Sequence, residues 1–358
     1  MPDPRALLEA TVAGITGADA ACAAAAQRAM DRKTKPRGSL GRLETIASRV
    51  AAIRGLAAPQ PAPSVVIVAA ADHGIAAENV SAFPQVVTAQ MIRNFADDGA
   101  AVCVLARRAG ARLVVVDAGV VADLGDIPGV SSRRIGAGTA NATRGPAMTQ
   151  DQALRALGAG IDLANDLAAD GVGLVGLGEM GIANSTSAAA VVAALLPADP
   201  AAVSGRGTGV DDLGLARKVD AVRRALAANA GAVKIREPIG VLAAVGGFEI
   251  GVLCGVVLGA AAARIPVLLD GFITTAAALV AVHISPACVE SLLASHRSTE
   301  PGHTMVLDAL ALEPILDLEM RLGEGSGAAL AIPIVNAALA LLDEMATFND
   351  ADVSDTGA

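Results

Sequence analysis

The sequence predicts an α/β protein in which helices flank a parallel sheet. Short apolar runs rich in valine, at residues 65–68 and 113–116, are typical of strands buried on both faces. They alternate with longer alanine-rich segments that have the length of helices. The apolar runs end in a polar side chain beside a glycine or another small residue. Because ligands bind at the carboxyl ends of the strands in such sheets, the pattern predicts a site there.

The elements of the first half are two helices, a linker and two strands. Residues 5–30 are Ala-rich and helical, and a second helix ends near residue 55. Pro59, Pro61 and Pro63 form a linker. Strand 65–68 leads through helices 85–95 and 99–108 to strand 113–116. Residues 123–147, rich in Gly and Pro, are predicted to be irregular.

The second half repeats the alternation. Thr149 and Gln152 form a capping box that opens a helix ending near residue 169. The remaining predicted elements are strand 172–177, helix 184–196, helix 212–229, strands 267–269 and 292–294, a helical C-terminal third and a frayed tail.

The composition indicates a large apolar core and disfavours nucleic-acid binding. The chain has 358 residues, 53% of them hydrophobic, enough for one large domain with an appendage or for two domains. Its net charge is −9, and it has five Phe but no Trp or Tyr, so it lacks both the positive charge and the stacking surface that nucleic acids require. The four cysteines are far apart, and the first residues lack a signal-peptide pattern. We therefore expect a cytoplasmic protein without disulfides.

Residues 239–263 could pass for a membrane span, because Glu249 is their single charge. Glycines recur every fourth residue from Gly247 to Gly259, which gives a helix one flat face. In a membrane, Glu249 would cost about 2.5–3.5 kcal/mol. We predict a buried helix, packed on the sheet or on a partner subunit, and no membrane span.

The polar groups at the strand ends are expected to converge on one cleft, since the carboxyl ends of parallel strands share one edge. They are Asp72 with His73, Asp117, Glu179, Asp270 and His296.

The stretch 172–187 is predicted to form the crevice, as a strand, a glycine turn and a helix N-terminus. Gly176-x-Gly178-x-x-Gly181 matches the dinucleotide-binding pattern. We reject that interpretation because the motif lies mid-chain, no acidic residue follows at the ribose position, and Glu179 would face a pyrophosphate. A tight turn with a solvated glutamate is the simpler alternative.

Three further motifs could carry chemistry. Glu324, flanked by glycines in an apolar neighbourhood, could act as a general base, although the motif alone favours a helix end with an exposed glutamate. The loop 205–209 with Lys218 could bind a phosphate, or be only a mobile loop. His296 and His303 have no helical metal-ligand spacing, so a metal site is disfavoured.

Collinear motifs from about residue 30 to residue 348 resemble those of the nicotinate-nucleotide–dimethylbenzimidazole phosphoribosyltransferase family. They lie at 34–44, 71–74, 81–88, 145–149, 178–186, 246–249, 269–272 and 321–328. The resemblance implies a Rossmann-like sheet domain at 59–304, a small helical domain from 1–58 and 305–348, a flexible tail at 349–358, and a homodimer.

The resemblance also implies an activity, the transfer of ribose 5-phosphate from nicotinate mononucleotide to 5,6-dimethylbenzimidazole. Glu324 falls on the family's general base, and Glu179 on a second active-site glutamate. We expect the phosphate and nucleotide to be bound by Lys218, Gly178, Gly181, Asn184, Ser185, Gly205 and Gly207. The base pocket is expected to comprise Ser81, Phe83, Pro84, Gln90, Met91, Met180 and Leu322.

This chemistry needs neither a cofactor nor a metal, because the nicotinate leaving group is already a cationic pyridinium. Removal of a proton from one ring nitrogen of the acceptor activates the other, and attack from the opposite face inverts C1′. The rival hypotheses are an NAD-dependent oxidoreductase and a non-catalytic nucleotide sensor.

Overall fold

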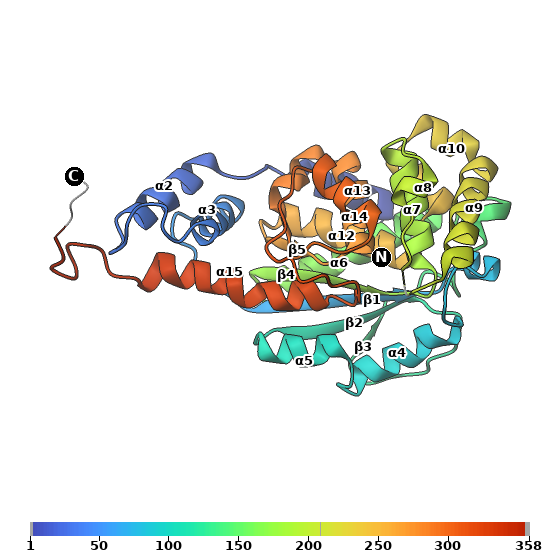
Figure 1. Ribbon diagram of the computed structural model, residues 1–358, viewed down its shortest axis with the longest axis horizontal. Coiled ribbons are helices and arrows are strands. Elements are labelled where there is room, and N and C mark those ends of the chain that lie inside the picture. The colour runs from blue at the N-terminus through green and yellow to red at the C-terminus, as the bar shows by residue number, and fades with distance from the viewer. Residues whose placement is uncertain (1–2, 208, 355–358) are drawn as a thin grey trace.

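The computed structural model describes residues 3–207 and 209–354, and its centre is a six-stranded parallel sheet (Figure 1). The strand order is β3-β2-β1-β4-β5-β6, which is that of a doubly wound, Rossmann-like sheet. The chain switches direction between β1 and β4, where such sheets bind ligands. The strands are β1 Ser64–Ala71, β2 Arg112–Gly119, β3 Val130–Ser132, β4 Leu174–Met180, β5 Val267–Leu269 and β6 Leu292–Ala294.

The predicted fold class is confirmed, and all five predicted strands are present. The short strand β3 was not predicted, because it lies within the Gly/Pro-rich stretch 123–147 and its three residues show no apolar run. The strand predicted at 172–177 extends to Met180, so the structure places Gly178 and Glu179 inside β4 rather than in a turn.

Helices cover both faces of the sheet (Figure 1). Alternate residues of β1 point to opposite sides, so Val65 and Ile67 belong to one core and Val66 and Val68 to the other. One face carries α6 Gln150–Ala169, α7 Asn184–Leu195, α12 Phe248–Ala262 and α13 Phe272–Ile284. The other carries α4 Val86–Ala96, α5 Ala101–Arg108 and the first part of α15 Ser326–Glu344.

The predicted helix 239–263 is two helices, α11 Pro238–Val245 and α12, separated at Gly246 and Gly247. The predicted packing of this segment on the sheet is confirmed, because α12 contacts β1, β2 and β4, and its glycine face packs on α6. A Cβ atom on Gly251 would lie 2.8 Å from the Cβ atom of Ala156, and one on Gly259 would lie 2.7 Å from that of Ala164. The glycines therefore allow two buried helices to approach closely.

Helix α15 is the one described helix that is long and apolar enough to cross a membrane. Of its most apolar 18-residue window, 56% is buried within the protein, and Pro333 lies inside the helix. A core helix of a folded protein meets the same criterion, and α15 packs on β1, β4 and β5.

The N-terminal segment predicted as one helix forms two, α1 Pro4–Gly14 and α2 Ala20–Asp31. Asp19 begins α2 by accepting hydrogen bonds from the N–H groups of Ala21 and Cys22. Helices α2 and α3 Arg42–Arg54 pack on each other and on α15, at one end of the long axis (Figure 1). Helix α1 packs instead on α6 and α12.

The predicted capping box of Thr149 and Gln152 is present at the start of α6. The division into domains stays a prediction, and residues 355–358 of the tail lie outside the described residues. The remaining elements are α8 Pro200–Val203, α9 Asp212–Ala228, α10 Ala230–Ile235, α14 Pro301–Ala309, and the 3-10 turns η1 Gly74–Glu78, η2 Ala142–Arg144 and η3 Pro286–Ser291.

Candidate active site

A cavity of about 310 Å³ lies beyond the carboxyl ends of β4, β5 and β6. Its floor is polar and its rim is apolar. Phe83 and Leu322 are large apolar side chains at the rim, and each is about half exposed. The lining residues are Phe83, Val87, Met91, Glu179, Met180, Gly181, Ile182, Asn184, Ser185, Gly207, Gly271, Phe272, Ile273, His296, Ser298, Glu300, Arg321, Leu322, Gly323 and Glu324.

Most of the site residues predicted from the sequence line this cavity. Lys218 and Gly205 lie directly behind it, because the Lys218 ammonium donates to the Ser185 hydroxyl and to the Gly205 carbonyl, both at 2.9 Å. Gly178 packs under the catalytic candidate, since a Cβ atom there would lie 2.6 Å from the Glu324 carbonyl carbon.

Three predicted base-pocket residues lie outside the lining. Ser81 and Pro84 line an adjoining depression of about 380 Å³ that shares Phe83 with the cavity. Gln90 is exposed on α4. The helix turns Met91 toward the cavity and its neighbour Gln90 away from it, because successive helical residues point about 100° apart.

The five strand ends converge only in part. Glu179 and His296 line the cavity, and Asp270 lies beside His296, with 3.7 Å between its Oδ1 atom and the imidazole Nδ1 atom. His73 is buried one layer deeper. Asp117 accepts hydrogen bonds from the N–H groups of Gly119 and Val120, and so closes the end of its own strand. The expectation that all five meet is therefore wrong for Asp117 and for Asp72 with His73, which do not line the cavity. Asp72 is buried and accepts the Val121 N–H at 2.8 Å.

His73 joins α7 to α12 through a buried polar chain. Its Nε2 atom lies 2.6 Å from the Glu249 carboxylate, and its Nδ1 atom lies 2.9 Å from the Ser187 hydroxyl. All three side chains are at most 2% exposed, so solvent and substrate do not reach them. The chain fixes the first turn of α7, which carries the cavity residues Asn184 and Ser185.

The first turn of α7 does not use its polar side chains as caps. Ala183, with φ of +75°, stands at the N-cap position without a side-chain hydrogen bond. Asn184 instead donates to the Glu179 carboxylate, and Ser185 accepts from Lys218. These two side chains, of types that commonly cap helices, therefore build the site instead.

Glu324 lies in a turn of three successive left-handed residues, with φ of +82° at Gly323, +63° at Glu324 and +85° at Gly325. Glycine adopts this conformation without cost, whereas a glutamate is strained by about 1–2 kcal/mol. The turn brings the chain against Glu179, whose Oε1 atom would lie 2.5 Å from a Cβ atom on Gly323. The two glutamates thus face one cavity from β4 and from the loop before α15.

Burial raises the proton affinity of both glutamates. It raises the pKa of Glu324 to about 7, with a further contribution from the nearby Asp270 carboxylate. Burial raises the pKa of Glu179 to about 8, although the Asn184 hydrogen bond opposes the shift. At neutral pH, Glu324 can therefore accept a proton, while Glu179 is mostly protonated.

The other end of the cavity offers a buried cation. Lys218 is 1% exposed, and loss of hydration lowers the pKa of its ammonium to about 8, an effect that the Glu300 carboxylate opposes. The Glu300 carboxylate accepts from the Gly207 N–H at 2.8 Å and so orders the loop next to Lys218. Thr208 of this loop lies outside the described residues. A buried ammonium suits an anion, because the charge of a bound anion would compensate for its lost hydration.

The structure gives no support to the two rejected sites. Gly176 and Gly178 lie inside β4, whereas a dinucleotide-binding motif places its glycines in the turn after the strand. No cluster of three or more His, Cys, Asp or Glu side chains within residues 3–207 and 209–354 is arranged to hold a metal ion. His303 accepts the Ser298 N–H at its Nδ1 atom, and burial lowers its pKa to about 3.

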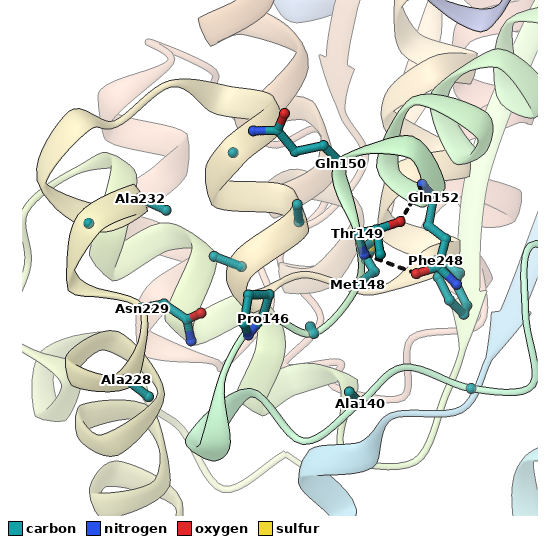
Figure 2. A pocket seen from close by; sticks show the side chains of 16 residues that line it. Ala140, Pro146, Met148, Thr149, Gln150, Gln152, Ala228, Asn229, Ala232 and Phe248 are labelled. Atoms are coloured by element: carbon teal, nitrogen blue, oxygen red, sulfur yellow. Dashed lines mark hydrogen bonds between the residues drawn. The ribbon is translucent and has the colours of Figure 1, made fainter.

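A larger cavity, of about 740 Å³, lies between the loop before α6 and helices α10 and α11 (Figure 2). Its lining is neutral, with Pro146, Met148 and Asn229 among small residues. Figure 2 shows Thr149 and Gln152 hydrogen-bonded to each other, and Asn229 donates to the Ala142 and Gly145 carbonyls. This cavity offers neither a base nor a cation, so we place the chemistry at the smaller one.

Several lining residues were not predicted as site residues. Phe272, Ile273, Ser298, Glu300 and Arg321 follow strand ends or flank a predicted motif. The signal for most of them was their position just after β5 or β6. Asp270 itself was predicted only as a strand-end group.

Known proteins with the same fold define the class. A family model described as a phosphoribosyltransferase matches residues 15–353. A crystal structure of the nicotinate-nucleotide–dimethylbenzimidazole phosphoribosyltransferase from Thermus thermophilus superimposes with a TM-score of 0.87 at 46% identity, covering 94% of this chain and 99% of that one. The fold and the match make the chain a phosphoribosyltransferase.

Full-length relatives narrow the class. The enzyme of the same name from Chloroflexus aggregans is 52% identical over 349 residues, covering 98% of both chains. That from Azotobacter vinelandii is 52% identical over 341 residues, covering 94% of this chain and 95% of the relative. The chain belongs to the nicotinate-nucleotide–dimethylbenzimidazole phosphoribosyltransferase family.

Proposed function

We propose that this protein transfers ribose 5-phosphate from nicotinate mononucleotide to 5,6-dimethylbenzimidazole. The products are nicotinate and α-ribazole 5′-phosphate, which supplies the lower ligand of cobalamin. The observation that carries the proposal is the Glu324 carboxyl, which lines an apolar-rimmed cavity and has its pKa raised to about 7.

In the proposed reaction, one nitrogen of the benzimidazole attacks C1′ while Glu324 takes the proton from the other. The bond between C1′ and the pyridinium nitrogen breaks, and its electron pair leaves with nicotinate. Because the leaving group is already cationic, no metal is needed to neutralise it. Attack on the face opposite the leaving group turns a β-linked donor into an α-linked product.

One end of the cavity would hold the phosphate of the donor, and the other end would hold the acceptor ring. Lys218, Ser185 and Gly207 would hold the phosphate, as a buried ammonium with a hydroxyl and a loop beside it. The acceptor ring would lie under Phe83, Met91 and Leu322 near Glu324. Glu179, protonated at neutral pH, would donate a hydrogen bond on the cavity floor.

We further propose that the enzyme works as a homodimer in the cytoplasm. The family supports the dimer, and the four cysteines, which are all free thiols, fit a reducing compartment. Size-exclusion chromatography with light scattering measures the mass in solution. A mass near 35.4 kDa, that of one chain, would contradict the dimer.

The decisive experiment mixes the protein with nicotinate mononucleotide and dimethylbenzimidazole in the presence of a chelator. Mass spectrometry then looks for α-ribazole phosphate, and NMR of the anomeric proton reports the configuration at C1′. Glu324→Gln should lower kcat by about 10²–10⁴-fold, the usual contribution of a general base, and leave donor binding in place.

Glu313→Gln is the matched control, because the Glu313 side chain is 77% exposed on the surface. A product that forms at an equal rate with Glu324→Gln would refute the general base. Binding of both ligands without any product would favour the nucleotide sensor instead, and a change in NADH fluorescence would favour the oxidoreductase.

A further inference from the structure

We infer that Asp270 is a positioning residue that holds the Glu324 turn in its reactive place. The inference rests on the proposed function and adds to it a residue outside the cavity lining. Asp270 follows β5, whereas Glu324 lies more than fifty positions later in the chain, in the loop before α15.

The Asp270 carboxylate closes the N-terminus of α15 from a neighbouring strand. Its Oδ1 atom accepts hydrogen bonds from the N–H groups of Gly327 at 2.7 Å and Ala328 at 3.2 Å. Its Oδ2 atom accepts from the N–H group of Gly325 at 3.0 Å. The N-cap residue of this helix, Gly325, has no side chain that could cap it, so these bonds satisfy N–H groups that would otherwise stay unpaired.

These three bonds hold the chain directly after the strained glutamate. Gly325 follows Glu324 directly, and both have left-handed backbones. A glutamate in this conformation persists only where its surroundings enforce it. Asp270 is 1% exposed and touches the chain on the helix side of the turn, while Gly178 of β4 packs beneath it. Asp270 is thus the polar group that ties the turn to the sheet.

The same bonds keep the helix N-terminus from acting as an anion site. Free N–H groups at a helix start attract a carboxylate or a phosphate and lower the pKa of a nearby acid. Because Asp270 accepts hydrogen bonds from these N–H groups, they do not lower the proton affinity of the Glu324 carboxylate. They also do not bind the substrate phosphate, which Lys218 binds instead. The charge of Asp270 also favours the protonated form of Glu324.

The electrostatic surroundings of Glu324 are defined by few groups. Those that face it from the packed elements are Glu179 from β4, Asp270 after β5, His296 after β6 and Arg321 from its own loop, with Cys103 of α5 in electrostatic reach. Of these, Asp270 alone both bonds to the turn and carries a charge that acts on Glu324.

The test compares Asp270→Asn with Asp117→Asn. The control is matched, because Asp117 is also a buried strand-end carboxylate that accepts two backbone N–H bonds, but at β2, away from the cavity. Asp270→Asn should lower kcat about 100-fold, since a displacement of about 1 Å of a catalytic group costs this much. The KM for nicotinate mononucleotide should change less than about threefold.

Two further readouts separate positioning from general stability. The acid limb of the pH profile of kcat/KM should move to lower pH in Asp270→Asn, because a negative charge near Glu324 is lost. In a Glu324→Gln background, Asp270→Asn should cost nothing further, since it acts through Glu324. An equal loss in both backgrounds, or an unmoved acid limb, overturns the inference.

Asp270→Ser is prepared as a second variant, so that the test can still be carried out if Asp270→Asn does not fold. If both Asp270 variants unfold while Asp117→Asn folds, the residue serves the stability of the fold and the inference is rejected. A wild-type protein that forms no α-ribazole phosphate refutes the proposed function. An active wild-type protein whose Asp270→Asn variant behaves like Asp117→Asn refutes only this inference.

Discussion

The Lys218 ammonium donates a hydrogen bond to the Ser185 hydroxyl at 2.9 Å, and this contact links helix α9 to the first turn of α7. No carboxylate within the described residues forms an ion pair with Lys218. A buried cation held by a hydroxyl and a carbonyl keeps its charge for an arriving anion.

Lys218→Met should therefore lower kcat/KM for nicotinate mononucleotide about 10- to 100-fold, the value of a hydrogen bond to a charged group. Nicotinate riboside, which lacks the phosphate, should react equally with both proteins. Steady-state kinetics with the two donors measures the difference. Lys234→Met, an exposed lysine on α10, is the control. An equal loss with both donors would contradict a phosphate contact.

The pH profile should be bell-shaped. Glu324 must be ionised to accept a proton, so kcat/KM should fall tenfold per unit as pH drops below about 7. Lys218 must be protonated to hold the phosphate, so kcat/KM should also fall above about 8. Initial rates across this range, at constant ionic strength, measure both limbs.

Each limb has its own control. The acid limb should vanish in Glu324→Gln, and the alkaline limb should vanish with nicotinate riboside. An alkaline limb that persists with the riboside would belong to Glu179, whose pKa is also raised to about 8, and would contradict the assignment to Lys218.

The sheet and much of the site could be predicted because both follow from local patterns. Short apolar runs mark the strands, and Glu179, Asp270 and His296 lie at or just beyond the carboxyl ends of β4, β5 and β6. Glycines on both sides of Glu324 pointed to it as a candidate base, and the structure adds that φ is positive at all three positions. The exposed glutamate that the motif alone favoured is wrong, because Glu324 is buried. These features need no knowledge of distant contacts.

The rest depends on contacts that no local pattern records. The carboxylate of Asp270 reaches N–H groups of residues 325–328, which only the folded sheet brings near. Asn184 and Ser185 have side chains typical of caps, but tertiary partners in Glu179 and Lys218 take them instead. Gln90 was predicted to line the base pocket, but only its neighbour Met91 lines the cavity, because the two side chains point in different directions from the helix.

The choice of acceptor should depend on Leu322. This side chain lines the cavity beside Glu324 and is 55% exposed, so its truncation removes apolar surface from the ligand site without opening the core. Leu322→Ala should lower kcat/KM for dimethylbenzimidazole by a factor that corresponds to about 1–3 kcal/mol of transition-state binding, the usual value of one methylene group in an apolar pocket. It should lower kcat/KM for unsubstituted benzimidazole by less. Competition between the two acceptors, followed by mass spectrometry, measures the ratio of their kcat/KM values.

Leu318→Ala is the control, because Leu318 is equally exposed but does not line the cavity. It should leave this ratio unchanged.

The contact between α6 and α12 should be the least tolerant of added volume. A Cβ atom on Gly255 would lie 3.0 Å from the Gly160 Cα atom and still closer to the Leu157 carbonyl, so the obstacle is backbone and cannot rotate away. Gly255→Ala should therefore lower the free energy of unfolding by about 1–3 kcal/mol, as overpacked cores do. Gly231→Ala on α10 is the control, because nothing lies within 4 Å of its Cβ position, and it should add about 0.5–1 kcal/mol through helix propensity. Urea unfolding measures both changes. If Gly255→Ala were as stable as Gly231→Ala, the two helices would have room to separate, and the glycine ladder would have no packing role within this chain.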